Sequence, residues 1–225
     1  GKKNAYKPNK NPQATILGNK QWDWFESSIA NSSARLIIIL SSIQVLATDH
    51  SYEKWANFPL ERSKLIKILS EAAQDKTVII VSGDRHRSGI YQNDFFTEIT
   101  ASSLNKPGSR FKESDPLLLG ETFPEINYGI LNIQPAEKQI IVSIHNKKGK
   151  ELNSKINQAV YSDNYTISEG FCERMEIFTS QKPLDLGFLT AFTLEHSDNY
   201  IYPYSWLNPK IAKILTVIEF NPFFT

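Results

Sequence analysis

Two short runs of branched apolar residues constrain the fold of this chain more than any other feature. Residues 36–40 read Leu-Ile-Ile-Ile-Leu, and residues 77–81 read Thr-Val-Ile-Ile-Val. Runs this apolar fit strands that are buried on both faces of a sheet. Between them, residues 59–72 carry an apolar stripe at helical spacing and begin with a proline, which suits the first turn of a helix. The order strand, helix, strand predicts a parallel βαβ unit with a right-handed crossover.

Further elements flank this unit on both sides. Before it, Trp22, Phe25 and Ile29 recur at helical spacing, and we place the N-cap of that helix at Asn19 and its end at residues 31–33. After it, we expect a short strand at residues 97–100, a loop at 102–127, an antiparallel hairpin formed by 128–133 and 139–144, and a turn at 147–150.

Length and composition set the broad class of protein. A chain of 225 residues suits one domain, or one domain with an appendage. The hydrophobic content of 40% supports a core, and the net charge of +1 gives no basic surface for nucleic acid. No apolar run approaches the ~20 residues that span a bilayer. Cys172 is the only cysteine, which excludes an intrachain disulfide.

The character of the chain changes near residue 157. Residues 158–225 hold 13 of the 26 aromatic residues and contain no motif that we can assign. We therefore divide the chain into residues 1–157 and an aromatic-rich segment of unknown role, 158–225. This segment is too aromatic for a disordered linker, so we expect it to pack on the sheet or on a partner. Tyr202, Tyr204 and Trp206 alternate and would share one face of an extended segment.

The strongest chemical signal follows the second buried run directly, at Gly83-Asp84-Arg85-His86. Ligand sites in α/β sheets gather at the carboxyl ends of strands. Asp84 and His86 are one residue apart, so both side chains would point to the same side of an extended backbone. A carboxylate with an imidazole suits zinc, iron or manganese, and Arg85 adds positive charge for a phosphate oxyanion. The alternative is a carboxylate that only forms a turn.

Two other segments are weaker candidates for the site. Gln44 follows the end of the first buried run and would face the same cleft as His86 if the two strands are parallel neighbours; a simple polar strand exit is the alternative. The loop at residues 48–62 is long and aromatic. Trp55 in this loop could wall a substrate pocket, and Arg62 could clamp an anion. Equally, Trp55 could pack the loop down and Arg62 could pair with an acid.

Taken in order, these segments resemble the PhoD-like alkaline phosphatases and phosphodiesterases, a family of calcineurin-like metallophosphoesterases. The resemblance covers about residues 14–156. It rests on six ordered motifs: Leu-Gly-Asn-Lys-Gln-Trp-Asp-Trp-Phe-Glu at 17–26, Ser-Ser-Ile-Gln-Val at 41–45, Glu-Lys-Trp-Ala-Asn-Phe-Pro-Leu-Glu-Arg at 53–62, Ser-Gly-Asp-Arg-His at 82–86, Ile-Thr-Ala-Ser-Ser-Leu-Asn at 99–105 and Asn-Tyr-Gly at 127–129.

The resemblance implies an α/β (α+β) fold, namely the C-terminal half of a β-sandwich flanked by helices, with a mixed sheet. It implies hydrolysis of phosphate mono- or diesters with two divalent or trivalent metal ions, drawn from calcium, iron, zinc and manganese. Asp84 and His86 correspond to metal ligands, and Arg85 would stabilise the phosphoryl group. Gln44 stands where the wider superfamily usually has a histidine ligand. The family is often exported, which suggests a periplasmic or extracellular location.

The first half of the family's active site has no counterpart before Leu17. The superfamily's earlier Asp-x-His, Gly-Asp and Gly-Asn-His segments supply most of the ligands for both metals, and two or three ligands cannot close a two-metal site. We therefore expect this chain to need a missing N-terminal half or a partner chain. The alternative is a catalytically inactive half-domain that binds a partner or serves a structural role.

Overall fold

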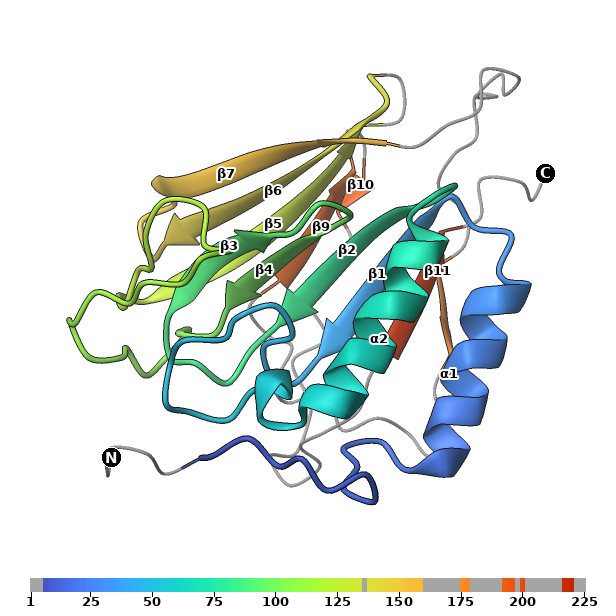
Figure 1. The fold of residues 1–225 in the computed structure, drawn as a ribbon. Coiled ribbons are helices and arrows are strands. Elements are labelled where there is room, and N and C mark those ends of the chain that lie inside the picture. The colour runs from blue at the N-terminus through green and yellow to red at the C-terminus, as the bar shows by residue number, and fades with distance from the viewer. Residues whose placement is uncertain are drawn as a thin grey trace.

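The computed structural model describes residues 6–134, 137–159 and four later strands (Figure 1). The elements in chain order are α1 (Asn19–Asn31), β1 (Leu36–Ser41), the 3₁₀ turn η1 (Trp55–Asn57), α2 (Pro59–Ala72), β2 (Thr77–Ser82), β3 (Ser88–Gln92), β4 (Thr97–Ala101), β5 (Asn127–Gln134), β6 (Gln139–Asn146), β7 (Glu151–Gln158), β8 (Met175–Phe178), β9 (Phe192–His196), β10 (Asn199–Tyr200) and β11 (Thr216–Phe220). No helix among these residues is long and apolar enough to cross a membrane.

The strands form two sheets. The first has the order β3-β4-β2-β1-β11-β8, in which β1, β2 and β4 are parallel and β3 and β11 run antiparallel to their neighbours. The second has the order β10-β9-β5-β6-β7, with β5, β6 and β7 as an antiparallel meander. The α/β class, the mixed sheet, the parallel βαβ unit and the β5–β6 hairpin are all confirmed.

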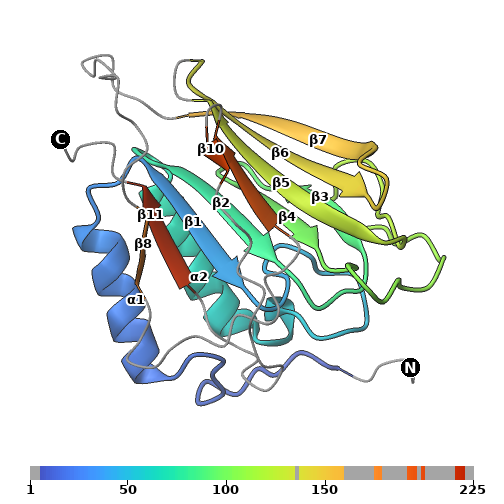
Figure 2. The same ribbon diagram turned by 180° about the vertical axis from the view of Figure 1, so that it is seen from behind.

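The buried runs in β1 and β2 divide their side chains between two cores. Ile37 and Ile39 face α1 and α2 and join one apolar cluster, whereas Leu36 and Ile38 face the second sheet and join another. Figures 1 and 2 show the helices on one side of the first sheet and the second sheet on the other. Both faces of β1 are therefore covered, which explains why its sequence carries no polar alternation.

The N-cap of helix α1 lies one residue earlier than we expected. The N-cap is Gly18, with φ of 74°, and Asn19 is already the first helical residue. A side chain is disfavoured at this positive φ, so glycine takes the position without steric cost. The buried face of α1 consists of Trp22, Phe25 and Ile29, as predicted.

Strands β3 and β7 were not predicted. Strand β3 (Ser-Gly-Ile-Tyr-Gln) has no apolar alternation, and β7 (Glu-Leu-Asn-Ser-Lys-Ile-Asn-Gln) is a largely exposed edge strand. Both pair with a neighbour that is itself well defined, β4 and β6 respectively. Their pairing is set by tertiary context, which local pattern does not reveal.

Four strands lie in the aromatic-rich segment that begins at residue 158. Strand β11 pairs antiparallel with β1 and with β8, and β9 pairs with β5 in parallel and with β10. Part of the segment therefore adds strands to both sheets (Figure 2). Tyr202, Tyr204 and Trp206, which we expected to share a face, lie outside the described residues.

The carboxylate of Glu61 on α2 fastens the N-terminal lead-in to the domain. It accepts hydrogen bonds from the backbone N–H groups of Ile16 and Leu17, from the Thr15 hydroxyl and from Trp22 Nε1, the last at 2.5 Å. Glu61 is 7% exposed, so these donors have little water to replace a lost acceptor.

Replacing Glu61 with glutamine should therefore lower the free energy of unfolding by about 1.5–3 kcal/mol, because charge-assisted hydrogen bonds are lost. Urea unfolding measures the change, and limited proteolysis should cut before residue 18 faster than in the wild type. Glu71→Gln on the same helix is the control, since Glu71 makes only an exposed pair with Lys67. Equal effects of the two substitutions would contradict the anchoring role.

Candidate functional site

Three parallel strands end side by side at one edge of the first sheet. Ser41 of β1 is in register with Ser82 of β2, and Ser82 is in register with Thr100 of β4. The loops that leave these strands, residues 42–54, 83–87 and 102–126, therefore emerge next to one another. This is the edge at which α/β sheets place ligand sites, because the loops diverge there and expose backbone and side-chain groups.

Asp84 and His86 lie in the loop between β2 and β3, and both side chains are exposed. The backbone at the two residues has positive φ, 64° at Asp84 and 52° at His86, so the extended geometry that we assumed for this motif is wrong. Few residues other than glycine adopt this conformation, although aspartate and histidine do so more often than most. Two such residues in one loop at a strand end are typical of a functional turn.

Neither Asp84 nor His86 makes a side-chain hydrogen bond or ion pair with another described residue. Desolvation and the nearby Glu53 raise the pKa of Asp84, while His86 and Arg85 lower it. A carboxylate and an imidazole that no hydrogen bond or ion pair of the described chain holds fit the role of metal ligands. Within the described part of the chain, however, no group of three or more histidine, cysteine, aspartate or glutamate residues is close enough to hold a metal ion.

Arg85, between these two residues, is buried and fully engaged. Its Nη2 donates to both carboxylate oxygens of Glu113, at 2.6 and 2.7 Å, and its Nε donates to Gln44 Oε1 at 3.1 Å. Its guanidinium also lies 4.5 Å from the ring centre of Tyr52, and its backbone N–H donates to Ser102 Oγ at 2.9 Å. The side chain is only 4% exposed. The structure thus does not place the Arg85 side chain in solvent beside Asp84 and His86.

Arg87 is held in the same way from the other side of His86. Its Nη1 donates to the backbone oxygen of Phe111 and to Thr122 Oγ1, both at 3.0 Å, and its Nη2 donates to the backbone oxygen of Ser109. Its Nε lies 3.5 Å from a carboxylate oxygen of Glu113. Glu113 therefore serves both buried guanidiniums, one before His86 and one after it.

Gln44 lies beneath this cluster and is 1% exposed. It donates through Nε2 to Thr100 Oγ1 at 2.9 Å while its Oε1 accepts from Arg85. The Thr100 hydroxyl in turn shares a 2.8 Å hydrogen bond with Ser82. The structure does bring Gln44 to the same strand edge as the Asp84 loop, where it connects the ends of the three parallel strands to Arg85.

Trp55 is 1% exposed and lies in the core. Its Nε1 donates to Ser41 Oγ at 3.1 Å, and its ring packs edge-on against Trp22, with ring centres 6.3 Å apart. Of the two roles considered for Trp55, the observed geometry is that of a side chain that packs the loop down onto the sheet.

Arg62 binds backbone carbonyl groups of the loop that follows β1. Its Nε donates to Val45 O at 2.6 Å and its Nη2 to Leu46 O at 2.9 Å. The N–H groups of the same two residues donate to the carboxylate of Glu98, which is 0% exposed on β4. Arg62 thus binds the carbonyl groups, and Glu98 the N–H groups, of the same two residues. Burial of Glu98 raises the pKa of its carboxyl group.

His50 lies in a strongly electropositive part of the site. Burial and the charges of Arg85, Lys54 and Arg87 lower its pKa from 6.5 to about 3, so the imidazole is neutral at physiological pH. Its Nδ1 accepts from the backbone N–H of Tyr52 at 3.2 Å, which places the proton of the neutral ring on Nε2.

The residues of the 102–126 loop that hold this site together were not predicted from the sequence. Besides Glu113, Asp115 accepts from the backbone N–H and hydroxyl groups of Thr48 and from the N–H of Asp49, which joins this loop to the one after β1. Gly108 lies against the turn, because a Cβ built on it would stand 2.4 Å from the backbone oxygen of His86. The loop is mixed in charge, with Lys106, Arg110 and Lys112 beside its four acidic residues, so nothing in the sequence singles out Glu113 or Asp115.

A family model described as PhoD-like phosphatase matches residues 1–156 of this chain. The chain belongs to the PhoD-like phosphatase family. The match covers the βαβ unit, the loop with Asp84 and His86, and the meander through most of β7.

Two solved structures share the fold. One is described as the structure of PhoD, with 17% sequence identity and a TM-score of 0.50, covering 69% of this chain and 35% of that one. The other is described as GAP50, the anchor in the inner membrane complex of Plasmodium, with 15% identity and a TM-score of 0.51, covering 69% of this chain and 47% of that one. The chain thus spans less than half the length of either. No curated protein matches it in sequence.

Glu113→Gln should destabilise the protein, because two buried guanidiniums would lose their shared counter-ion. The side chain is 20% exposed, which screens the charges in part, so we expect a loss of about 2–3 kcal/mol in the free energy of unfolding by urea. Glu121→Gln in the same loop is the matched control, since Glu121 pairs with Lys112 at the surface. A change below 0.5 kcal/mol is expected there. If Glu113→Gln and Glu121→Gln changed the free energy of unfolding equally, Glu113 would not be needed as the counter-ion of the two arginines.

The lowered pKa of His50 should make the free energy of unfolding fall in mild acid. Its pKa is lower in the folded state than in the unfolded chain, so its contribution is complete above pH 6.5 and declines as the pH falls toward 3. His50→Asn keeps an acceptor for the Tyr52 N–H but cannot titrate. Between pH 7 and 5, the wild type should lose about 1–2 kcal/mol more than this variant. Parallel stability–pH curves, measured by urea unfolding, would rule out the effect.

Proposed function

We propose that this chain supplies Asp84 and His86 as metal ligands to a two-metal site that hydrolyses phosphate mono- or diesters. The observation that carries the proposal is the exposed aspartate–histidine pair on a turn of positive φ at the sheet edge. Membership of the PhoD-like phosphatase family supports it. The metal pair would come from calcium, iron, zinc and manganese.

The chemistry divides between the bound ions and the residues of this chain. Two bound metal ions would supply Lewis acidity and a nucleophilic water at the phosphorus atom. Asp84 would neutralise part of their charge, and His86 would bind as the neutral imidazole. Arg85 and Arg87 act from beneath as positioning residues, because their guanidiniums are bound to Glu113 and to backbone groups. Their positive field favours an anionic substrate in the space above.

The remaining ligands must come from residues beyond the described pair, since two side chains do not satisfy two ions. We propose that they come from an N-terminal half of the domain, in the same protein or in a partner chain. Catalysis would then require both parts. The chain's coverage of 35% of the PhoD structure is consistent with this division.

A second candidate function is a non-catalytic module of the same fold. The observation that favours it is the absence, among the described residues, of any acidic, histidine or cysteine group of three that could hold a metal ion. GAP50, which shares the fold, is described as an anchor, which is an attachment role rather than a catalytic one. If this second function is correct, the protein should be stable and should have no phosphatase activity, whether alone or together with an N-terminal half.

Turnover of bis(4-nitrophenyl) phosphate and 4-nitrophenyl phosphate by the full-length protein encoded by the gene tests the first proposal. His86→Ala and Asp84→Asn should each lower kcat/KM at least 100-fold, about 2.7 kcal/mol, with circular dichroism and urea unfolding nearly unchanged. Asp94→Asn, an exposed carboxylate before β4, is the control. Residues 1–225 alone should bind zinc, manganese and calcium weakly in calorimetry.

Two results would refute the proposal. Near wild-type turnover in His86→Ala would exclude this residue as a ligand. No turnover by the full-length protein with any of the four metals would favour the non-catalytic module. A sub-micromolar complex of residues 1–225 with two ions would instead show that the ligand set of this chain is complete.

A further inference from the structure

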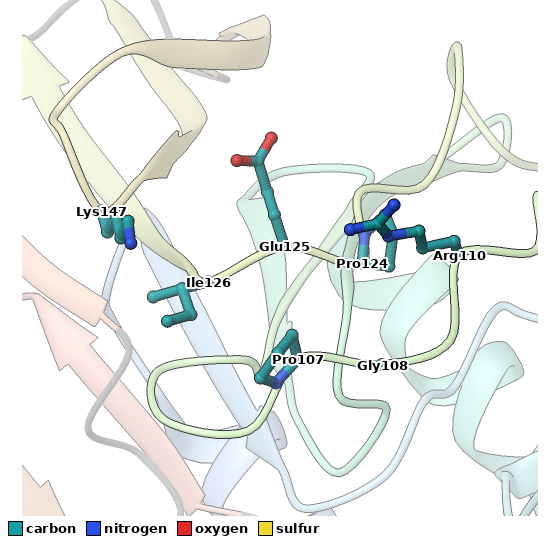
Figure 3. A pocket seen from close by; sticks show the side chains of 7 residues that line it. All are labelled: Pro107, Gly108, Arg110, Pro124, Glu125, Ile126 and Lys147. Carbon is teal, nitrogen blue, oxygen red and sulfur yellow. The ribbon is translucent and has the colours of Figure 1, made fainter.

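A cavity of about 380 Å³ opens where the loop after β4 meets the start of β5 and the end of β6. Its volume lies within the range of small-molecule sites, about 300–1,000 Å³. Figure 3 shows the residues that line it, which come from three stretches of chain: Pro107, Gly108, Arg110, Pro124, Glu125, Ile126 and Lys147.

This cavity adjoins the proposed metal-binding turn. Gly108 is part of its wall, and the α-carbon side of Gly108 faces the backbone oxygen of His86 so closely that a Cβ would stand 2.4 Å away. The same glycine donates its N–H to Pro124 O at 3.0 Å, which joins two parts of the wall. The cavity therefore borders the backbone of the turn, and a substrate bound at the turn would reach it by extending past His86.

The charges of the cavity are not used by the fold. The side chains of Arg110 and Lys147 form no hydrogen bond or ion pair with the rest of the described chain, unlike those of Arg85, which binds Glu113, and Arg87, which binds the backbone oxygen of Phe111. Pro107, Pro124 and Ile126 lie between these two cations, and so does Glu125 (Figure 3). A cation pair across an apolar floor fits a ligand with an apolar body and an oxyanion.

We propose that the cavity is a subsite for the alcohol portion of the phosphate ester, and that it selects alcohols that carry a second oxyanionic group, a carboxylate or a phosphate. The inference rests on the proposed phosphoesterase function and deepens it. Arg110 and Lys147 bind the oxyanion, and the two prolines with Ile126 contact the apolar body. Glu125 on the rim opposes additional negative charge, so the subsite takes one oxyanion rather than a polyanion.

Direct binding to residues 1–225 tests the subsite without any need for turnover. The probes are benzoate, phenylphosphonate and, as the neutral analogue, benzyl alcohol. We expect benzoate and phenylphosphonate to shift the amide resonances of residues 108–110, 125–126 and 147 in ¹H–¹⁵N spectra, with millimolar affinity that weakens at high salt. Benzyl alcohol should leave these resonances unshifted. The stronger of the two anions identifies carboxylate or phosphate as the preferred group.

Matched variants separate the two cations from the general charge of the surface. Arg110→Ala and Lys147→Ala should each weaken binding about two- to fivefold, as expected for exposed charge pairs. Lys148→Ala removes a neighbouring exposed lysine that does not line the cavity, so affinity should not change. Glu125→Gln should tighten binding of both anions. Equal binding of benzyl alcohol and benzoate, or unchanged affinity in the Arg110→Ala/Lys147→Ala double variant, would overturn the proposal.

A kinetic measurement on the full-length protein distinguishes this proposal from the function on which it rests. The readout is the ratio of kcat/KM for 4-carboxyphenyl phosphate to that for phenyl phosphate. We expect this ratio to fall about two- to fivefold in Arg110→Ala and in Lys147→Ala. No turnover of either substrate would refute the phosphoesterase function, while the binding spectra would still report on the subsite. Turnover with an unchanged ratio in both variants would refute the subsite alone.

Discussion

The arrangement of the site depends on one carboxylate that is shared by two buried guanidiniums. Glu113 is the shared counter-ion of Arg85 and Arg87, which flank His86 in the chain, and so the turn that carries the candidate ligands is held from both ends. Two cations so close together could not stay buried without a counter-ion, because desolvation of each is costly. Through Arg85 the same carboxylate also orders Gln44, and hence the ends of the three parallel strands.

Much of the scaffold could be predicted because its signals are local. The apolar runs of β1 and β2, the stripe of α2 and the hairpin of β5 and β6 each follow from a pattern of a few residues. The position of the Asp84 and His86 loop after β2 was predicted correctly, but its backbone conformation was not. Nothing in the Gly-Asp-Arg-His sequence distinguishes an extended exit from two left-handed residues, and the contact with Gly108 that accompanies this turn comes from a distant loop.

The partners of the charged residues could not be predicted, because they are remote in sequence. Arg85 meets Glu113 28 positions later, and Arg62 meets backbone carbonyls 16 and 17 positions earlier, with no charge to mark them. Trp55, Arg62 and Gln44 all belong to stretches that resemble the family, yet all three serve the integrity of the loops. Similarity to the family in these stretches therefore indicates a shared fold. Asp84 and His86 are the residues that bear on the proposed catalysis.

The contact between Gly108 and the His86 backbone would couple the two proposed binding events, one in the cavity and one at the turn with Asp84 and His86. Gly108 forms part of the cavity wall and packs directly against the backbone of His86, with no side chain of its own between the two. Packed contacts of this kind transmit small shifts rather than damp them. If an occupant of the cavity displaced Gly108 and so changed the affinity of the turn for a metal ion, the ion would by thermodynamic reciprocity change the affinity for that occupant by the same factor. The absence of a side chain at Gly108 would thus let the two proposed sites act as a single cooperative unit.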